Sequence, residues 1–306
     1  MNFPGRSFKG ALPAPTDGEI ELASRLRAHV QMLAGTIGQR NIYHPEQLLA
    51  AAAYIERTFR EQGHEPVPLF YTVQGQEVRN IEVMIAGGTK ASEIVVVGAH
   101  YDSVRGCVGA NDNASGMAAA LEMARLLRGK PLKRTLRLVA FVNEEPPFFQ
   151  TESMGSLMYA RLCKKRGDKI VAMFTPETIG YYSDARGSQQ YPFPFSLFYP
   201  DTGNFIAFVG NTASRALVSR SVASFRSHTD FPSEAAALPA SIQGIGWSDH
   251  WSFWQKGWPA FMVTDTAPFR YPHYHEVTDT PDKIDYERTA RVVMGLMRVA
   301  EALGNE

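Results

Sequence analysis

The residues in this chain best suited to chemistry are acidic and imidazole side chains that come directly after apolar segments. They fall at predicted strand ends or at a helix start: His100, Asp102, Asp112, Glu144, Glu145 and Glu177. Several carboxylates gathered at one place repel one another unless a cation compensates their charge. Imidazole and carboxylate ligands without cysteine are typical of zinc sites. The residue types therefore predict a metal site, with zinc as the favoured ion.

Each of these residues also has an ordinary structural explanation. A histidine after a strand is more often a hydrogen-bonded core residue than a ligand, and Asp112 could cap a helix. A pair such as Glu144 and Glu145 usually belongs to a solvated turn. The convergence of these residues, rather than any one of them, favours the metal site.

That convergence depends on the elements that precede the polar residues. Apolar runs at 94–100, 135–142 and 170–174 indicate strands covered on both faces. Helical patterns at 114–128 and 155–166 alternate with them. The alternation predicts an α/β fold with three layers, α/β/α, around a mostly parallel, mixed central sheet. Ligands bind at the carboxyl ends of strands in such sheets, which is where the candidate residues fall.

The remaining patterns complete a single predicted domain over residues 1–306. Further helices are predicted at 16–33, 45–62 and 285–303, and further strands at 67–73, 78–85 and 260–264. Thr16 and Glu19 fit a capping box at the start of the first helix, and Asp285 is expected to cap the last one. Residues 1–15 are expected to form an arm on the surface.

Residues 182–246 differ in composition from the rest of the chain. They contain a stretch rich in proline and aromatics at 191–200, a helical pattern at 214–225 and small residues at 234–240. We interpret this segment as an elaborated insertion near the cleft, where it would wall a substrate site. An ordinary long connection with a small core of its own is the alternative.

The charge balance limits the partners of the chain. Lys plus Arg number 31 and Asp plus Glu number 31, so the formal net charge is zero. A balanced chain without a basic block has no electrostatic reason to bind nucleic acid or an anionic membrane. No apolar run reaches the ~20 residues that a membrane helix needs, so no membrane segment is expected. Cys107 and Cys163 are expected to be free thiols outside any Cys-x-x-Cys zinc motif.

The N-terminus bears on location. It contains Arg6 and Lys9 but no apolar stretch behind them, which is not typical of a signal peptide. The chain as given is therefore expected in the cytoplasm, and an exported or periplasmic location is expected if a leader has been removed. The sequence leaves the oligomeric state open.

Several motifs resemble one family of enzymes and follow the family's order. They are 98–103 (GAHYDS), 109–116 (GANDNASG), 143–145 (NEE), 177–181 (ETIGY), 248–250 (SDH) and Tyr274-His275 with Asp279-Thr280 behind it. Together they resemble the co-catalytic zinc exopeptidases of metallopeptidase family twenty-eight. That family includes bacterial leucyl aminopeptidases, aminopeptidase Y, glutamate carboxypeptidase and glutaminyl cyclase. The resemblance spans residues 100–285 and implies the zinc-exopeptidase (phosphorylase/hydrolase-like) fold.

The resemblance also implies two Zn²⁺ ions that share one carboxylate. Asp112 would bridge the two ions. His100 and Glu177 would complete the ligands of one ion, and Glu145 and His275 those of the other. Glu177 stands where the family usually has aspartate, so its longer side chain departs from the pattern.

Two histidines compete for the last ligand position in this scheme. His275 directly follows Tyr274, as the family pattern requires, whereas His273 lies two residues earlier. The resemblance therefore implies His275 as the ligand.

Catalytic and supporting roles follow from the same resemblance. Glu144 would be the general base that takes a proton from the attacking water and passes it to the leaving amine. Asp102 would orient His100 through its second ring nitrogen. Asp249 and His250 are expected either to support the ligands or simply to pack.

The resemblance implies an enzyme that hydrolyses peptides, and an aminopeptidase is the leading prediction. Phe148 and Phe149 follow the predicted base and favour an apolar first residue in the substrate. A glutaminyl cyclase is one alternative on the same fold, but it lacks the equivalent of His100. A non-catalytic binding domain is another, but such domains lose their ligands.

Two further alternatives have less support. A glutamate-type carboxypeptidase needs cationic groups for acidic substrates, and Arg105, Arg186 and Arg270 are the scattered candidates. A serine hydrolase would need a nucleophile elbow, and residues 246–250 lack its second glycine.

Overall fold

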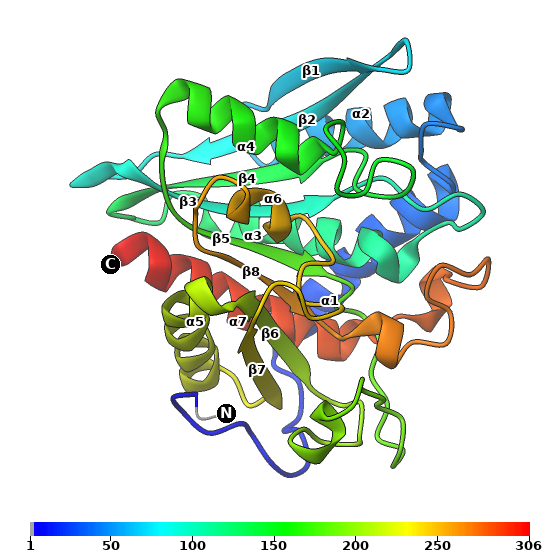
Figure 1. Cartoon of the computed structure of the whole chain (residues 1–306), viewed down its shortest axis with the longest axis vertical. Helices are drawn as coiled ribbons and strands as arrows, with labels where there is room; N and C mark the ends of the chain where they lie inside the picture. The colour runs from blue at the N-terminus through cyan, green and yellow to red at the C-terminus, as the bar shows by residue number, and fades with distance from the viewer. Residues whose placement is uncertain (1–2) are drawn as a thin grey trace.

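The computed structural model describes residues 3–306 and is organised around an eight-stranded mixed sheet (Figure 1). The strands are β1 (Val67–Val73), β2 (Gln76–Ile85), β3 (Lys90–His100), β4 (Arg134–Phe141), β5 (Lys169–Glu177), β6 (Ile206–Asn211), β7 (Ser233–Leu238) and β8 (Ala260–Thr264). Their order across the sheet is β1-β2-β4-β3-β5-β8-β6-β7. The central strands β4, β3, β5 and β8 are parallel, whereas β2 and β6 pair antiparallel with them on either side.

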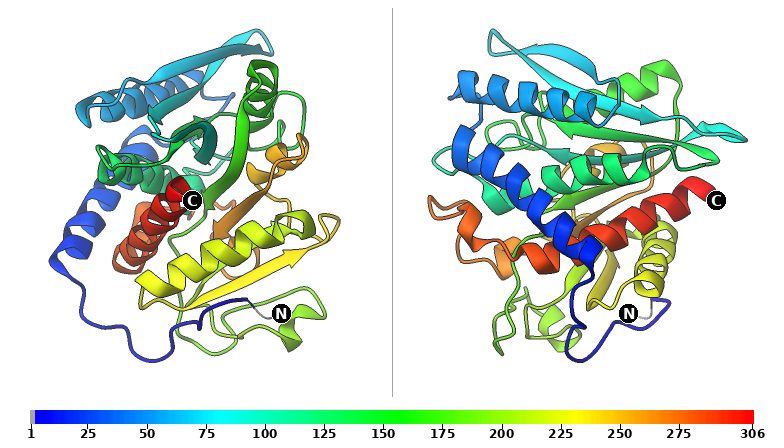
Figure 2. Two further views of the ribbon diagram at one scale, coloured as in Figure 1. Left: turned by 90° about the vertical axis from the view of Figure 1, so that its left-hand side faces the viewer. Right: turned by 180° about the vertical axis from the view of Figure 1, so that it is seen from behind.

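Helices cover both faces of this sheet. They are α1 (Asp17–Val30), α2 (Pro45–Glu61), α3 (Gly116–Leu127), α4 (Gly155–Arg166), α5 (Arg215–His228), α6 (His250–Trp254) and α7 (Tyr286–Asn305). The main core lies between the sheet and α1, α2, α3, α5 and α7, while α4 and α6 cover the opposite face (Figure 2). The predicted three-layer α/β/α fold with a mixed sheet is confirmed. Within residues 3–306 no helix is long and apolar enough to cross a bilayer.

The local signals in the sequence produce the expected elements. The backbone N–H of Thr16 donates to Glu19 at 2.7 Å, and the N–H of Glu19 donates back to the Thr16 hydroxyl, so the capping box begins α1. Asp285 accepts from the N–H of Arg288 at 3.0 Å and begins α7. The second half of β3 is buried throughout, as its continuous apolar sequence predicts.

Residues 182–246 contribute two strands that the sequence did not indicate. β6 and β7 are parallel, are joined through α5, and extend the sheet beyond β8. The sequence of β7, Ser-Glu-Ala-Ala-Ala-Leu, is poor in the β-branched and aromatic residues that mark strands. The rest of the segment forms loops, among them the aromatic stretch 191–200.

The N-terminal residues run along the outside of β7 and α5 (Figure 2). The Ser7 hydroxyl accepts from the backbone N–H of Ser233, and Arg226 of α5 donates to the carbonyl of Pro4. Arg291 of α7 donates to the carbonyl of Pro13 at 2.6 Å. Residues 3–15 thus lie as an arm held by hydrogen bonds, whereas Met1 and Asn2 of the predicted arm lie outside the described residues.

Three stacked phenylalanines join the strands at the centre of the sheet. The ring of Phe261 lies 5.5 Å from Phe174 and 5.9 Å from Phe208, with interplanar angles of 20° and 26°. All three side chains are fully buried. They connect β5, β8 and β6, and so tie the added strands to the parallel core.

We expect Phe261→Ala to lower the free energy of unfolding by about 3–5 kcal/mol, because it leaves a cavity between two packed rings. Denaturant unfolding followed by circular dichroism measures the change. The matched control is Phe193→Ala, whose side chain is 84% exposed and should change stability by less than about 0.5 kcal/mol. Equal effects of the two substitutions would contradict this account of the core.

Candidate metal centre

The candidate residues meet where three neighbouring parallel strands end. His100 is the last residue of β3, Glu177 is the last residue of β5, and Glu144 and Glu145 follow β4. Because β4, β3 and β5 are adjacent and parallel, their carboxyl ends lie at one edge of the sheet. Asp112 reaches the same place from the turn that precedes α3. The structure therefore brings the predicted residues together.

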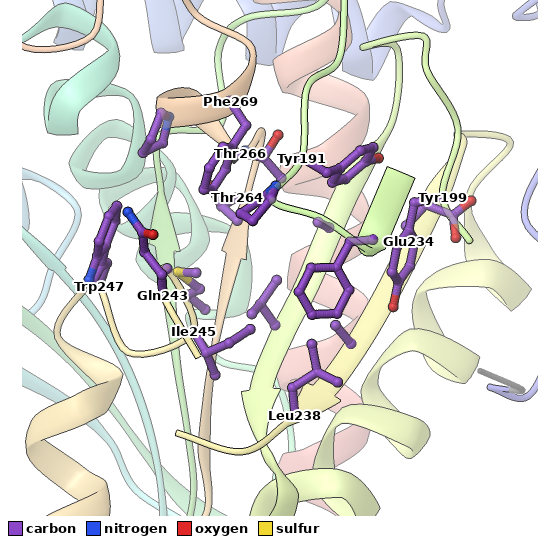
Figure 3. Close-up of a pocket in the computed structure, with 18 of the residues that line it drawn as sticks. Tyr191, Tyr199, Glu234, Leu238, Gln243, Ile245, Trp247, Thr264, Thr266 and Phe269 are labelled. Atoms are coloured by element: carbon purple, nitrogen blue, oxygen red, sulfur yellow. Dashed lines mark hydrogen bonds between the residues drawn. The ribbon is translucent and has the colours of Figure 1, made fainter. Parts of the chain in front are cut away.

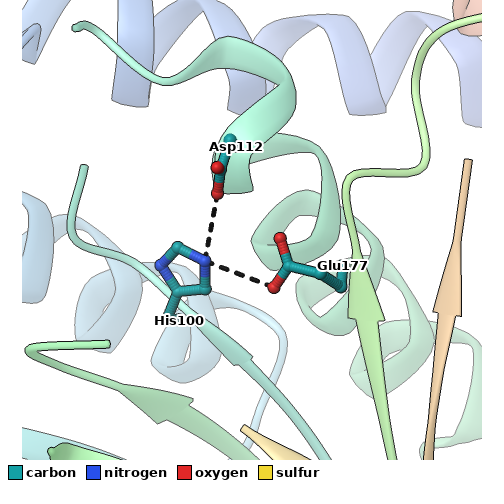
Figure 4. Close-up of side chains that lie close together, drawn as sticks. All are labelled: His100, Asp112 and Glu177. Carbon is teal, nitrogen blue, oxygen red and sulfur yellow. Dashed lines mark ion pairs between the residues drawn. The ribbon is translucent and has the colours of Figure 1, made fainter. Parts of the chain in front are cut away.

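One group of ligand atoms surrounds the ring of His100 (Figure 4). Nε2 of His100 lies 3.2 Å from Oδ1 of Asp112 and 3.3 Å from Oε2 of Glu177. These three side chains are buried, and their ligand atoms lie within 4.8 Å of one another. The Ser248 hydroxyl donates to Oε2 of Glu177 at 2.6 Å and fixes the longer side chain. Glutamate at this position therefore reaches the site that the family fills with aspartate.

A second group shares Asp112 with the first. Nε2 of His275 lies 3.0 Å from Oδ2 of Asp112 and 3.5 Å from Oε2 of Glu145. The ligand atoms of these three residues also lie within 4.8 Å of one another. Asp112 thus points one oxygen toward each histidine. This is the arrangement that a carboxylate bridging two cations requires.

The competing histidine points elsewhere. Nδ1 of His273 lies 2.8 Å from the hydroxyl of Thr278, and among residues 3–306 His273 belongs to neither ligand group. The ring of His275 stacks on Tyr274 with centroids 3.9 Å apart, which holds the ring toward Asp112. The side chain of His275 is 33% exposed, so this part of the site opens to solvent.

Unsatisfied atoms indicate that the donor set fits a cation. Nε2 of His100 and Oε1 of Glu145 are buried and make no hydrogen bond within the described part of the chain. Buried polar atoms are almost always hydrogen-bonded, so such orphans need a partner. Imidazole nitrogen and carboxylate oxygens that converge in this way suit zinc.

The acidic groups in the cluster differ in the direction in which their pKa values are shifted. Burial raises the pKa of Glu145 well above its usual range, and Asp112 and Glu144 raise it further. Burial acts on Asp112 too, but the His100 and His275 imidazoles beside it outweigh burial and hold the pKa of Asp112 below its usual range. The shared carboxylate is therefore kept ionised, while its neighbours bear an electrostatic cost that a cation would relieve.

Glu144 occupies the position of a proton carrier beside the ligands. Its Oε2 lies 3.9 Å from Nε2 of His100, and its side chain is almost fully buried. Burial raises the pKa of Glu144 well above its usual range; His100 opposes the shift and Glu177 adds to it. A carboxyl group with a raised pKa can both accept and return a proton near neutral pH.

Asp102 has a second task that the sequence did not reveal. Its Oδ1 lies 3.5 Å from Nδ1 of His100, whereas the backbone carbonyl of Asp102 lies nearer, within hydrogen-bond distance of the same nitrogen at 3.2 Å. Both of its oxygens also accept backbone N–H bonds, from Glu144 and from Glu145, each at 3.1 Å. Asp102 therefore fixes the turn after β4 and the ring at the end of β3 together.

Asp112 is itself held by residues that the sequence identified only as part of a motif or not at all. Asp279 accepts from the backbone N–H groups of Asn111 at 2.8 Å and Asp112 at 3.1 Å. Asp265, directly after β8, accepts from the side-chain amide of Asn111 at 2.8 Å. The Asp279-Thr280 motif was the signal for one of these supports, and Asp265 had no signal.

A buried arginine holds the loop that leads to Asp112. Arg40 is fully buried and donates to the carbonyls of Tyr101 at 2.6 Å and Gly109 at 2.8 Å. These carbonyls lie at the two ends of the loop between His100 and Asp112. No local pattern in the sequence distinguishes Arg40 from a surface arginine.

Backbone strain concentrates at the same place. Asn143, Thr178 and His275 have φ values of 59°, 47° and 59°, in the left-handed region that side chains other than glycine rarely adopt. Asn143 directly precedes Glu144, Thr178 directly follows Glu177, and His275 is itself a candidate ligand. Strain of this kind persists where the surrounding contacts fix a functional geometry.

Asp249 and His250, which are adjacent in the sequence, differ in their surroundings. Nε2 of His250 bonds to the carbonyl of Ile245 at 2.8 Å, and the ring packs edge-on against Trp254 at 4.6 Å. His250 is therefore a packing residue. Both oxygens of Asp249 are buried without a hydrogen bond in residues 3–306, and burial raises the pKa of Asp249 to about 7.

Two of the three cationic candidates for acidic substrates, Arg105 and Arg270, are engaged elsewhere. Arg270 donates to the side chain of Gln189 at 2.7 Å and to the carbonyl of Phe205 at 2.7 Å. Arg105 lies 4.8 Å over the ring of Tyr43. Neither arrangement offers a guanidinium group to the ligand cluster.

Comparisons with known proteins identify the family of this chain. A family model described as "Peptidase family M28" matches residues 80–300, and the chain belongs to that family of peptidases. The Escherichia coli K12 protein YfbL, described as uncharacterized, is 36% identical over 282 residues, or 89% of this chain and 86% of YfbL. A probable leucine aminopeptidase from Arthroderma otae is 28% identical over 322 residues, or 97% of this chain and 77% of the relative.

Solved structures show the same fold. BSAP, described as a zinc aminopeptidase from Bacillus subtilis, gives a TM-score of 0.73 at 16% sequence identity, and the match covers 97% of each chain. The family and the fold that the motifs predicted are thus confirmed.

We expect His275→Ala to weaken zinc binding by about 10-fold or more, because it removes a converging nitrogen. His273→Ala is the matched control and should leave zinc binding unchanged, since His273 bonds only to Thr278 in this region. Zinc content after dialysis, measured by elemental analysis, gives the ranking. The reverse ranking would place the ligand two residues earlier.

Proposed function

We propose that this protein is a two-metal zinc aminopeptidase that removes an apolar first residue from peptides. The observation that carries the proposal is the pair of ligand groups that share Asp112, with Glu144 beside them. The names of the relatives support the same activity, since one is a probable leucine aminopeptidase and BSAP is a zinc aminopeptidase.

The residues would divide between two zinc ions. His100 and Glu177 would hold one ion, Glu145 and His275 the other, and Asp112 both. Bound zinc would supply polarisation of the scissile carbonyl and activation of a water molecule. The assignment uses every member of the two groups that share Asp112. A third group of close ligand atoms, from His100, Glu144 and Glu145, receives no ion of its own, which leaves Glu144 for proton transfer.

Glu144 performs the proton transfers in this proposal. It accepts a proton from the attacking water and donates it to the departing amine, so that the carboxyl group returns to its starting state. Asp102 holds the backbone of Glu144 through a hydrogen bond of 3.1 Å, which fixes the direction from which the carboxylate acts. The Glu144 carboxylate, which accepts the proton, is therefore positioned by the fold rather than by the substrate.

Recognition of the substrate's free amine would distinguish an aminopeptidase from other exopeptidases. Glu144 and Glu177 are buried carboxylates at the site, and each can accept a hydrogen bond from an amine or ammonium group. A blocked amine would lose these contacts and leave the acceptors unpaired, at a cost of about 1–3 kcal/mol. The engaged positions of Arg105 and Arg270 give a substrate carboxylate no comparable partner.

An apolar pocket adjoins the metal ligands. Glu177 and Tyr274 line its near end, and Phe205, Ile245 and Phe269 are among its apolar walls (Figure 3). Strands β6 and β7 and the loops around them, all within residues 182–246, supply much of this wall. A large apolar first residue would bury its side chain here.

We expect Glu144→Gln to lower kcat by roughly 10²–10⁴, the usual contribution of a positioned base, while both zinc ions remain bound. Steady-state kinetics and elemental analysis on the same preparation separate the two effects. Glu152→Gln is the control, because its side chain lies in the following loop and is 81% exposed. Full activity of Glu144→Gln would remove Glu144 from its role.

We expect release of amino acid from leucyl and phenylalanyl amides and about 10-fold or more slower release from their N-acetylated forms. Chelation of the metal should abolish the activity and added zinc should restore it. Efficient cleavage of N-blocked peptides with a free C-terminal carboxylate would instead indicate a carboxypeptidase. Ammonia release from N-terminal glutamine would indicate a cyclase.

A further inference from the structure

The apolar pocket beside the metal ligands contains one acidic group that the proposed reaction does not use. The pocket encloses about 910 Å³ including its opening, and Glu234 of β7 lines it together with Tyr191 and Tyr199. Tyr199 and Glu234 appear together at the end away from Trp247 (Figure 3). A carboxylate in such surroundings needs an explanation, because burial of a charge without a partner is costly.

Strand register places Glu234 in line with the metal ligand Glu177. Glu177 of β5 pairs with Thr264 of β8, Thr264 pairs with Ala207 of β6, and Ala207 pairs with Glu234 of β7. Side chains of paired residues in adjacent strands point to the same face of a sheet. All four residues line the pocket, so this row forms its floor.

The two glutamates mark opposite ends of that floor. Three strand spacings of about 4.8 Å separate their backbones. Between them lie only the hydroxyl of Thr264 and the methyl group of Ala207. An extended side chain that starts at the metal ligands would therefore run across an apolar floor toward Glu234.

Side chains point alternately to the two faces of the sheet along β7, and Glu234 is on the face that lines the pocket. Burial alternates along β7: Ala235 is buried and packs in the main core, whereas Glu234, Ala236 and Leu238 are only half-buried and line the pocket, to which Ala235 also contributes. Arg226 of α5 donates to the backbone and hydroxyl of Ser233 and to the N-terminal arm.

Among residues 3–306 the Glu234 carboxylate has no close partner, although the charges of Arg226 and Lys9 act on it. Within residues 3–306 Glu234 forms no hydrogen bond or ion pair, and its side chain is half-buried. Burial raises the pKa of Glu234, although Arg226 and Lys9 oppose the shift. A cation entering the pocket would relieve the same cost of burial.

We propose that this pocket receives the side chain of the first substrate residue and that Glu234 selects a cationic tip, as in lysine or arginine. The aliphatic stem of such a residue packs on apolar walls while its charged end keeps a polar partner. The rings of Tyr191 and Tyr199 add favourable faces for a cation at that end. A leucine side chain fills the near part of the same pocket and does not reach Glu234.

This inference rests on the proposed aminopeptidase activity. It keeps the apolar pocket for the stem of the first residue but changes the preferred residue from a wholly apolar one to one with a cationic end. The test compares first residues of nearly equal shape: arginyl against citrullyl amides, and lysyl against norleucyl amides. With the zinc-loaded full chain, kcat/KM should favour the cationic member of each pair by about 10- to 100-fold, the worth of a hydrogen bond between charged groups. Inhibition by free arginine against free citrulline gives the same comparison without turnover.

Glu234→Gln should reduce each preference to near unity. Asp201→Asn is the matched control, because Asp201 is an exposed carboxylate two residues after Tyr199 in the sequence and its loss changes the net charge equally. Circular dichroism and leucyl amide hydrolysis of the Asp201→Asn and Glu234→Gln proteins show whether each is folded.

Two outcomes would overturn the inference. Equal rates and equal inhibition for the cationic and neutral members in the unmodified protein would exclude a cation subsite, and a preference that persists in Glu234→Gln would assign it to another group. If leucyl amide is cleaved in either case, only this inference fails. If no free-amine amide is cleaved with zinc present, the proposed function fails and this inference fails with it.

Discussion

Repulsion between carboxylates that cannot reach water is the constraint on which the centre of this molecule depends. Parallel strands deliver Glu145 and Glu177 to the same edge, and Asp112 lies between them. The two histidines offset part of this charge by contacting Asp112 from both sides. The remaining charge favours cations, so the gathering of these side chains at the strand ends and the metal chemistry depend on the same charges.

The supports around the site follow from the same constraint. Asp102 and Asp279 add still more negative charge, but each directs it at two backbone N–H groups next to a ligand. These hydrogen bonds hold loop segments that lie outside any helix or strand. Arg40 lies behind them and places a positive charge where the loop carbonyls also need donors. The left-handed backbone at Asn143 directly precedes the Glu144 N–H that Asp102 binds, and Thr178 donates its own N–H to the side chain of Asn113 at 3.2 Å, so local hydrogen bonds hold both strained positions.

Sequence reasoning was accurate where local patterns carry the information. The continuous apolar sequence of β3 and the capping box at Thr16 give each element its own signal, and strand ends then locate His100 and Glu177. It failed for β7, whose alanines pack against α5 although their intrinsic strand preference is low. The contacts of Arg40 span more than sixty residues of sequence, so no local pattern could reveal them.

The N-terminal arm has a consequence for the outer boundary of the sheet. β7 is a terminal strand, and such a strand offers unpaired N–H and C=O groups to any other extended chain. Ser7 and Arg226 occupy the N–H and the carbonyl of Ser233 in this strand. Side chains of the arm and of α5 thus cover part of this exposed strand edge, in place of an additional strand. The covering protects an edge that would otherwise be prone to self-association.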